Sequence, residues 1–165
     1  MTDNFMTLML KEELVNEAES TRKVLERLPE ERLSWTPHEK SMTLGQLALH
    51  VAILPGELSE FFRELSREVP EVPLEEAEST KEILKRFEES VTKAEEILTS
   101  WSEKDLAAEW RMTHEGKTIM SGPRYSMVRT IMLNHWYHHR AQLTVYLRLL
   151  DVPVPGIYGP SADEQ

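Results

Sequence analysis

The spacing of the apolar residues constrains this chain most, because they recur every three or four positions along nearly its whole length. That period places them on one face of an α-helix, whereas a half-buried strand requires alternation at every second position. No internal repeat or low-complexity tract interrupts the pattern. We therefore predict an all-α fold, and the length of 165 residues predicts one domain, residues 1–165, with its own core.

Two long helices are predicted in the first half of the chain. The first covers residues 3–28 and ends before a proline. The second begins after Ser41 or Thr43, because either side chain can cap it, and its apolar stripe continues to residue 65. Pro55 lies inside that stripe and removes one backbone donor, so we expect a kink there rather than an end.

Two more long helices are predicted after an extended linker at residues 69–73, where prolines disfavour helix. The third helix, residues 79–101, begins with a capping box between Ser79 and Glu82. The fourth covers residues 124–150. The segments between these two helices are expected to form a short helical turn and a long loop with extended pieces, at residues 102–110 and 111–123. Amphipathic helices of this length are most economically buried as a four-helix bundle.

The charge balance argues against nucleic acid as a partner. The chain has 19 Lys and Arg against 29 Asp and Glu, a net charge of −10, and such a field repels phosphate backbones. No stretch approaches the ~18 unbroken apolar residues of a membrane span, so we expect no membrane partner. The N-terminus has no basic segment of the kind that begins a signal peptide, which predicts a cytoplasmic protein.

Three histidines give the chain its candidate chemistry. His135 and His139 stand four residues apart, and therefore project from the same helix face about one turn apart. His50 lies on the apolar stripe of the second helix and is the natural third ligand of a divalent metal site. The chain has no cysteine, so only nitrogen and oxygen donors are available. The alternative is that each imidazole is a hydrogen-bonded core residue.

The fourth helix shows where these ligands should lie. The residues expected near its buried face are Val128, Ile131, Met132, His135, His139, Leu143 and Tyr146. His138 points about 100° away from His139, so we assign it a supporting or structural role. Trp136 stands where a helical zinc protease needs its glutamate base, which disfavours peptide hydrolysis of that type.

Further side chains could support the site or form a pocket beside it. Gln46 precedes His50 by one turn and Glu57 follows it by two, so either could orient a ligand or a bound water. Trp136 and Tyr137 could line a pocket, although aromatic residues at such positions usually belong to the core. The remaining histidines, His38 and His114, fall in predicted loops and are expected on the surface.

Two stretches of the sequence, GQLALHVA at residues 45–52 and NHWYHHRAQL at residues 134–143, resemble the DinB/YfiT-like family of metalloenzymes. The resemblance covers essentially the whole chain. It implies a four-helix bundle with up-down-down-up connectivity, His50, His135 and His139 as ligands of zinc or nickel, and a homodimer. Ala141 stands where many members have glycine, which puts no ligand in doubt.

The resemblance also implies a class of activity, because some members are S-transferases that use low-molecular-weight thiols such as bacillithiol or glutathione. A metal held by three nitrogens would favour the reactive thiolate form. The same site could instead activate water for hydrolysis of a small molecule. A third alternative is a bundle without catalytic activity that binds a metal or ligand, for example in a stress response. The sequence does not choose among the three.

Overall fold

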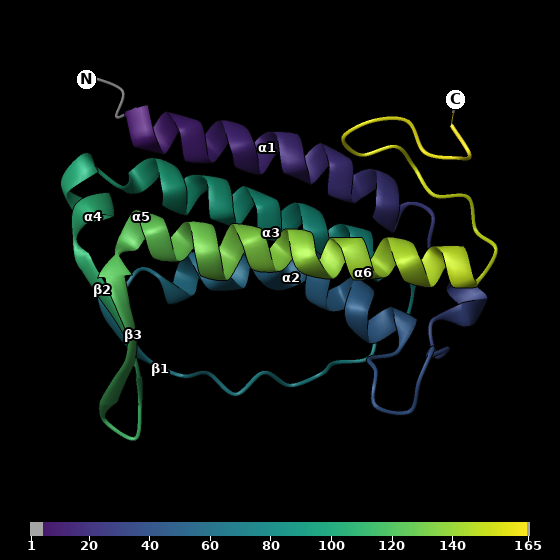
Figure 1. The fold of residues 1–165 in the computed structure, drawn as a ribbon, viewed down its shortest axis with the longest axis horizontal. Helices are drawn as coiled ribbons and strands as arrows, with labels where there is room; N and C mark the ends of the chain where they lie inside the picture. The colour runs from purple at the N-terminus through teal and green to yellow at the C-terminus, as the bar shows by residue number, and fades with distance from the viewer. Residues whose placement is uncertain (1–4, 165) are drawn as a thin grey trace.

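The structure, a computed structural model, describes residues 5–164 and is predominantly helical with a small sheet. Its elements are, in chain order, α1 (Phe5–Leu25), η1 (Glu30–Arg32), α2 (Leu44–Phe61), β1 (Ser66–Glu68), α3 (Thr80–Ser100), α4 (Glu103–Ala107), β2 (Glu109–His114), β3 (Lys117–Pro123), α5 (Arg124–Met127), η2 (Val128–Asn134) and α6 (His135–Leu149). The long helices lie side by side (Figure 1). None of the described helices is long and apolar enough to span a membrane.

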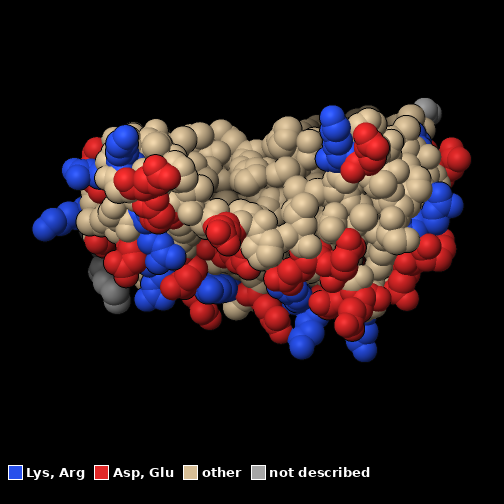
Figure 2. Space-filling model, turned by 90° about the horizontal axis from the view of Figure 1, so that it is seen from below, with Lys and Arg blue, Asp and Glu red and all other residues tan. Residues whose placement is uncertain are grey.

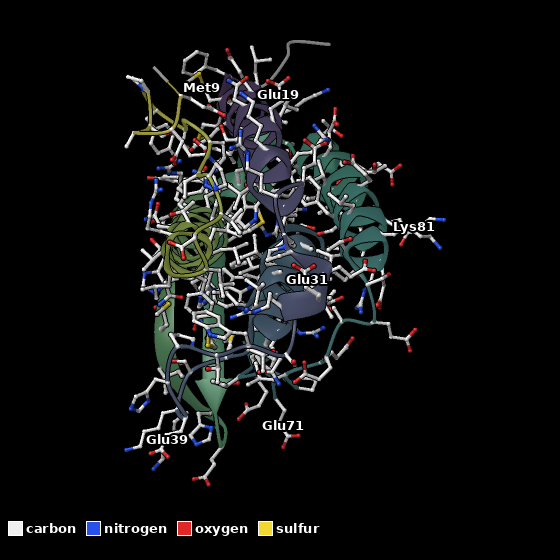
Figure 3. All side chains as sticks on the ribbon, turned by 90° about the vertical axis from the view of Figure 1, so that its right-hand side faces the viewer. Met9, Glu19, Glu31, Glu39, Glu71 and Lys81 are labelled. Atoms are coloured by element: carbon white, nitrogen blue, oxygen red, sulfur yellow. The ribbon has the colours of Figure 1, made fainter. Side chains whose placement is uncertain are left out.

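The long helices enclose one apolar core. Figure 3, seen along the helices, shows α1, α2, α3 and α6 around a shared interior, with charged side chains such as Glu19 and Lys81 pointing outward. Side chains from every long helix are fully buried there, among them Leu14, Leu25, Leu47, Phe87 and Trp136. Burial of this kind stabilises a helical fold more than local propensity does. The core therefore fixes how the helices that carry the histidines face one another.

The first two helices differ from the prediction mainly at their ends. The start expected at residue 3 lies outside the described residues, and α1 ends at Leu25 rather than at residue 28. Thr43 rather than Ser41 caps α2, since its hydroxyl accepts from the Gln46 N–H at 3.1 Å while the Gln46 side chain accepts from the Thr43 N–H at 3.0 Å. The helix continues through Pro55 and ends before residue 62, because the chain then turns into β1.

Only half of the predicted capping box at the start of α3 forms. The Ser79 hydroxyl accepts from the Glu82 N–H at 3.1 Å, as expected. The Glu82 carboxylate instead accepts from the N–H of Glu78 at 2.8 Å. The first turn of α3 is still capped, because its Glu82 N–H has the Ser79 hydroxyl as acceptor and its Thr80 N–H has the Glu30 carboxylate at 3.0 Å.

The prediction of an all-α fold is correct only in part: the chain is predominantly helical, but three strands form a sheet in the order β1-β2-β3. β1 pairs with β2 in parallel, and β2 pairs with β3 as an antiparallel hairpin across most of the predicted loop at 111–123. The hairpin turn is made by Glu115 and Gly116, whose φ angles of 50° and 74° are those of a type I′ turn. The predicted turn at 102–110 is correct in part and forms α4.

An extended segment without regular structure follows β1 and passes along α2. We call residues 70–75 the strap. One end is held by the Val69 N–H, which donates to the Thr113 carbonyl at 2.8 Å. The other end is held by the ion pair of Glu75 with Arg86 at 2.7 Å. The strap is therefore fixed at both ends. Figure 1 shows it passing along one side of α2.

The predicted fourth helix forms from residue 124 to residue 149 but is not α-helical throughout. Its middle, η2, is a π-helical segment of seven residues, and α6 begins directly after it at His135. A π-helical turn contains one more residue than an α-helical turn, and such segments are frequent at functional sites. The interruption changes which residues of α6 face the core.

Candidate metal centre

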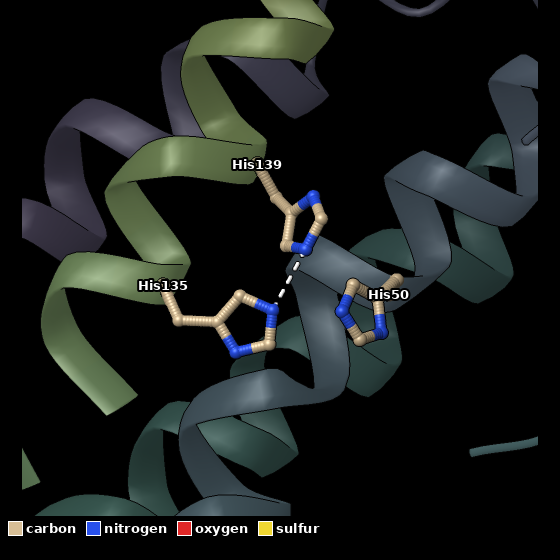
Figure 4. Close-up of side chains that lie close together, drawn as sticks. All are labelled: His50, His135 and His139. Atoms are coloured by element: carbon tan, nitrogen blue, oxygen red, sulfur yellow. Dashed lines mark hydrogen bonds between the residues drawn. The ribbon is translucent and has the colours of Figure 1, made fainter. Parts of the chain in front are cut away.

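His50 from α2 and His135 and His139 from α6 converge on one point (Figure 4). Their candidate ligand atoms all lie within 4.8 Å of one another, and the three rings are half-buried. The ring centroids of His50 lie 5.6 Å from His135 and 4.7 Å from His139. The structure thus brings together the three residues that the sequence analysis selected, in an arrangement that could hold a metal ion.

In His135 and His139, one ring nitrogen faces the other ring (the inner nitrogen, Nε2) and one faces away (the outer nitrogen). The hydrogen bonds of the outer nitrogens suit a cation between the inner ones. Nδ1 of His139 lies 2.8 Å from the amide oxygen of Gln142, so it carries the proton and donates. The His135 ring donates to the Ile131 carbonyl, one turn earlier. With both outer nitrogens donating, each ring presents the lone pair of Nε2, and the two Nε2 atoms lie only 2.7 Å apart, the distance of the hydrogen bond drawn in Figure 4 when one of them carries a proton. Two lone pairs that close repel each other, and a shared positive charge between them removes the repulsion.

Burial makes a metal ion a better source of that charge than a proton. Burial, and then the neighbouring imidazoles of His139 and His135, lowers the pKa of His50 to about 4. The pKa of His135 and that of His139 are also lowered, chiefly by burial. All three rings are therefore neutral at pH 7, the form in which imidazole binds metals. The donor set fits a divalent ion such as zinc or nickel.

A hydrogen bond joins α2 and α6 beside their histidines. Pro55 has no N–H, so the Val51 carbonyl one turn earlier lacks its helical donor. The Nε1–H of the fully buried Trp136 donates to that carbonyl at 2.9 Å. Val51 follows His50 and Trp136 follows His135, so the bond joins the two helices directly beside these two candidate ligands. Trp136 thus lies where it can support the site, and it is absent from the lining of the groove described below.

The opposite side of α6 is fastened to α1. The buried Arg140 forms an ion pair with Glu17 at 2.6 Å and donates to the Tyr158 hydroxyl at 2.6 Å. The Tyr137 hydroxyl donates to the Glu13 carboxylate at 2.9 Å, and burial raises the pKa of Tyr137. The pocket role considered for Tyr137 does not match this placement, since its side chain reaches α1 and is absent from the groove described next.

A groove of about 360 Å³ leads to the histidines. One wall is α2 and the other is the strap, with His50 and His135 among the lining residues. Gln46 and Glu57 both line it, although the Gln46 amide oxygen is engaged in capping α2. Figure 2 shows this face hollowed in the middle, with uncharged residues in the hollow and acidic side chains near it. A small molecule can therefore reach the histidines from solvent.

The other histidines lie outside the convergence. His138 is exposed, with its ring 5.1 Å from that of His139, and does not line the groove. His38 and His114 are exposed as expected. The sequence analysis missed Gln142, which fixes the orientation of the His139 ring. Its position three residues after a candidate ligand, on the same face of the helix, was the available signal.

Comparisons with known proteins agree over the length of the chain. The model of the DinB family matches residues 1–165. A crystal structure of a DinB-like protein from Bacillus cereus ATCC 10987 is 31% identical, with a TM-score of 0.66 over 87% of this chain and 92% of that one. The uncharacterised protein YrdA of Bacillus subtilis (strain 168) is 28% identical over 149 residues, 90% of this chain and 85% of YrdA.

A further crystal structure shows the same fold at lower identity. The DinB-like protein YjoA from Bacillus subtilis is 16% identical, with a TM-score of 0.68 over 95% of this chain and 99% of YjoA. At that identity the likeness concerns the fold alone. The chain therefore has a DinB-like fold.

Proposed function

We propose that this chain, which belongs to the DinB family, is a metal-dependent enzyme that transfers a low-molecular-weight thiol onto a small electrophilic molecule. The observation that carries the proposal is the facing pair of imidazole Nε2 atoms, 2.7 Å apart, with His50 beside them. The groove that ends at these rings supplies the space for a substrate. Zinc or nickel is the proposed ion, because three neutral nitrogens suit both.

The three histidines would hold the ion and leave room for a further ligand. Bound there, it would lower the pKa of a thiol and so raise the fraction present as thiolate at neutral pH. In the transfer, the sulfur forms a bond to the electrophilic carbon while the bond from that carbon to the leaving group breaks. The leaving group departs with the electron pair, and the thiol proton passes to water.

The chain's own residues contribute position and a low dielectric. Gln142 and the Ile131 carbonyl hold the outer nitrogens of their histidines, so both inner nitrogens point inward. The apolar wall of α2 and the strap exclude part of the water around a bound molecule. Exclusion of water strengthens electrostatic interactions at the reacting atoms.

Elemental analysis of untagged protein, purified without chelator or added metal, tests the metal site. We expect about one ion per chain in wild type and almost none in His50→Ala, His135→Ala or His139→Ala. The exposed His38→Ala is the matched control and should keep the ion. Wild type without metal, even after incubation with zinc or nickel, would refute the proposal and favour a bundle without catalytic activity.

Activity of the loaded protein then separates the two reaction classes. Electrophiles are incubated with the protein in the presence and absence of bacillithiol or glutathione. A thioether that forms only with thiol and active protein supports transfer. A product that forms equally without thiol would instead identify a hydrolase.

A further inference from the structure

The groove has different chemistry at its two ends. Its α2 wall is mostly apolar, with Leu49, Ile53, Leu54, Leu58 and Phe61 among the lining residues. His50 lies toward one end of this wall and Phe61 at the other, 11 positions apart, or roughly 16 Å along the helix. An extended apolar body therefore fits along α2 with one end at the histidines. The chemistry at the Phe61 end decides what the other end of such a molecule carries.

Arg67 of β1 stands at the Phe61 end. Its guanidinium lies over the Phe61 ring, 5.4 Å from the ring centroid, and Arg67 lines the groove. Among the residues that the structure describes, no carboxylate forms an ion pair with it, although the chain carries 29 Asp and Glu. Arg67 is exposed, but stacking on an aromatic ring restrains its guanidinium and leaves its N–H donors free. A free, positioned guanidinium suits a carboxylate or a similar anion.

Unlike Arg67, the acidic residues of the groove either have ion-pair partners or are exposed to solvent. Glu60 pairs with Arg63 and Lys93, and Glu75 pairs with Arg86. Glu57 and Glu71 are exposed and can turn into solvent, where carboxylates are well hydrated. Arg67 is thus the cation in the groove that no carboxylate of the described chain neutralises.

We infer that the groove binds a small molecule with an extended apolar body and one anionic group, and that Arg67 pairs with the anion at the Phe61 end. The apolar body lies between α2 and the strap, and the reactive end reaches His50 and His135. This inference rests on the proposed function for the identity of the site, and it adds the chemical class of the substrate.

Three ligands with one apolar body test the inference: decanoate, decanol and decylamine, titrated by calorimetry into the full chain after metal removal and again with zinc. In the metal-free chain we expect decanoate to bind about fivefold tighter than decanol, as for an exposed ion pair, and decylamine to bind weakest. Arg67→Gln should abolish the preference for decanoate and leave the Kd of decanol unchanged. Tightest binding of decylamine would overturn the inference, because Glu57 and Glu71 would then set the preference.

Two further variants locate the binding. Arg111→Gln changes the net charge by the same amount as Arg67→Gln. It is the matched control, because Arg111 lies on β2 opposite Ser66 and does not line the groove. The Arg111→Gln chain should keep the preference for decanoate. Loss of that preference in this control would overturn the role of Arg67. Leu58→Trp should fill the groove and weaken the binding of all three ligands. Unchanged binding in this variant would place the ligands elsewhere and overturn the inference. Absence of binding in wild type would overturn it too. The metal-free titration also separates the hypotheses, because a decanoate preference in a chain that takes up no zinc refutes the proposed function alone.

Discussion

Replacement of Trp136 by phenylalanine tests the hydrogen bond that joins the two ligand helices. The indole N–H donates to the Val51 carbonyl at 2.9 Å, and Pro55 leaves that carbonyl without a helical donor. Trp136→Phe keeps an aromatic ring in a fully buried site and removes the donor. The Val51 carbonyl then has no other donor in the helix. The variant therefore measures the loss of this hydrogen bond together with the loss of part of the ring volume.

The structure sets the size of the effect. A buried carbonyl that loses its partner costs about 1–3 kcal/mol of stability. The bond lies one residue from His50 and one from His135, so its loss should also relax the distance between these two candidate ligands. Loss of groups that orient metal ligands lowers metal affinity about 10–100-fold. We expect the smaller effect here, a zinc affinity about tenfold weaker than in wild type.

Trp110→Phe is the matched control, because Trp110 is also fully buried but its Nε1 has no hydrogen-bond partner. Both variants lose the same ring volume, and only Trp136→Phe loses a bond. Stability is measured by chemical denaturation of the metal-free proteins, and zinc affinity by competition with a chromophoric chelator. Pro55→Ala restores an N–H one turn after Val51, so in the Trp136→Phe background it should recover about 1 kcal/mol. Equal stability losses in the two tryptophan variants, with wild-type zinc affinity in both, would refute the reasoning.

Two further predictions concern the imidazoles. Gln142→Leu should weaken zinc binding about tenfold, because the His139 ring loses the acceptor of its Nδ1–H, whereas Gln142→Glu should keep the affinity; equal loss in both variants would contradict this role. In the metal-free protein His50 should titrate near pH 4 by NMR, below the unfolded pKa of about 6.5. Between these two pH values the unfolded chain binds more protons than the folded chain. Stability should therefore fall as pH drops from 7.5 to 5, by about 1 kcal/mol after allowance for partial exposure, and a His50→Ala chain with the same acid loss would contradict the prediction.

The sequence predicts which histidines come together, because two local rules suffice for that grouping. A spacing of four puts His135 and His139 on one helix face whatever the rest of the fold does. His50 falls on the face of α2 that turns toward α6, as its position in an apolar stripe indicated. The long helices follow for the same reason, since amphipathic periodicity is a local signal that tertiary packing reinforces.

The sheet could not be predicted in the same way, because its strands depend on pairing between distant residues. Ser66 of β1 has Arg111 of β2 as its partner, and no local pattern specifies that contact. The hairpin turn has a glycine only at its second central residue, with Glu115 at φ 50° before it, a weaker signal than Asn-Gly or Asp-Gly. The half-formed capping box has a similar cause, since Glu78 competes with Ser79 for the Glu82 carboxylate.

The π-helical segment explains why the buried face of the fourth helical segment differs from the predicted stripe. From the π-helical segment onward the buried side chains are Val128, Met132, Leu133, Trp136, Arg140, Leu143 and Leu147. His135 and His139 each stand one position before a buried residue, so they lie at the edge of the core and are half-buried. That edge position serves the site, because enough water is removed to keep the rings neutral while the groove still reaches them. Full burial would have closed the site, and full exposure would have left rings that bind a proton readily in mild acid.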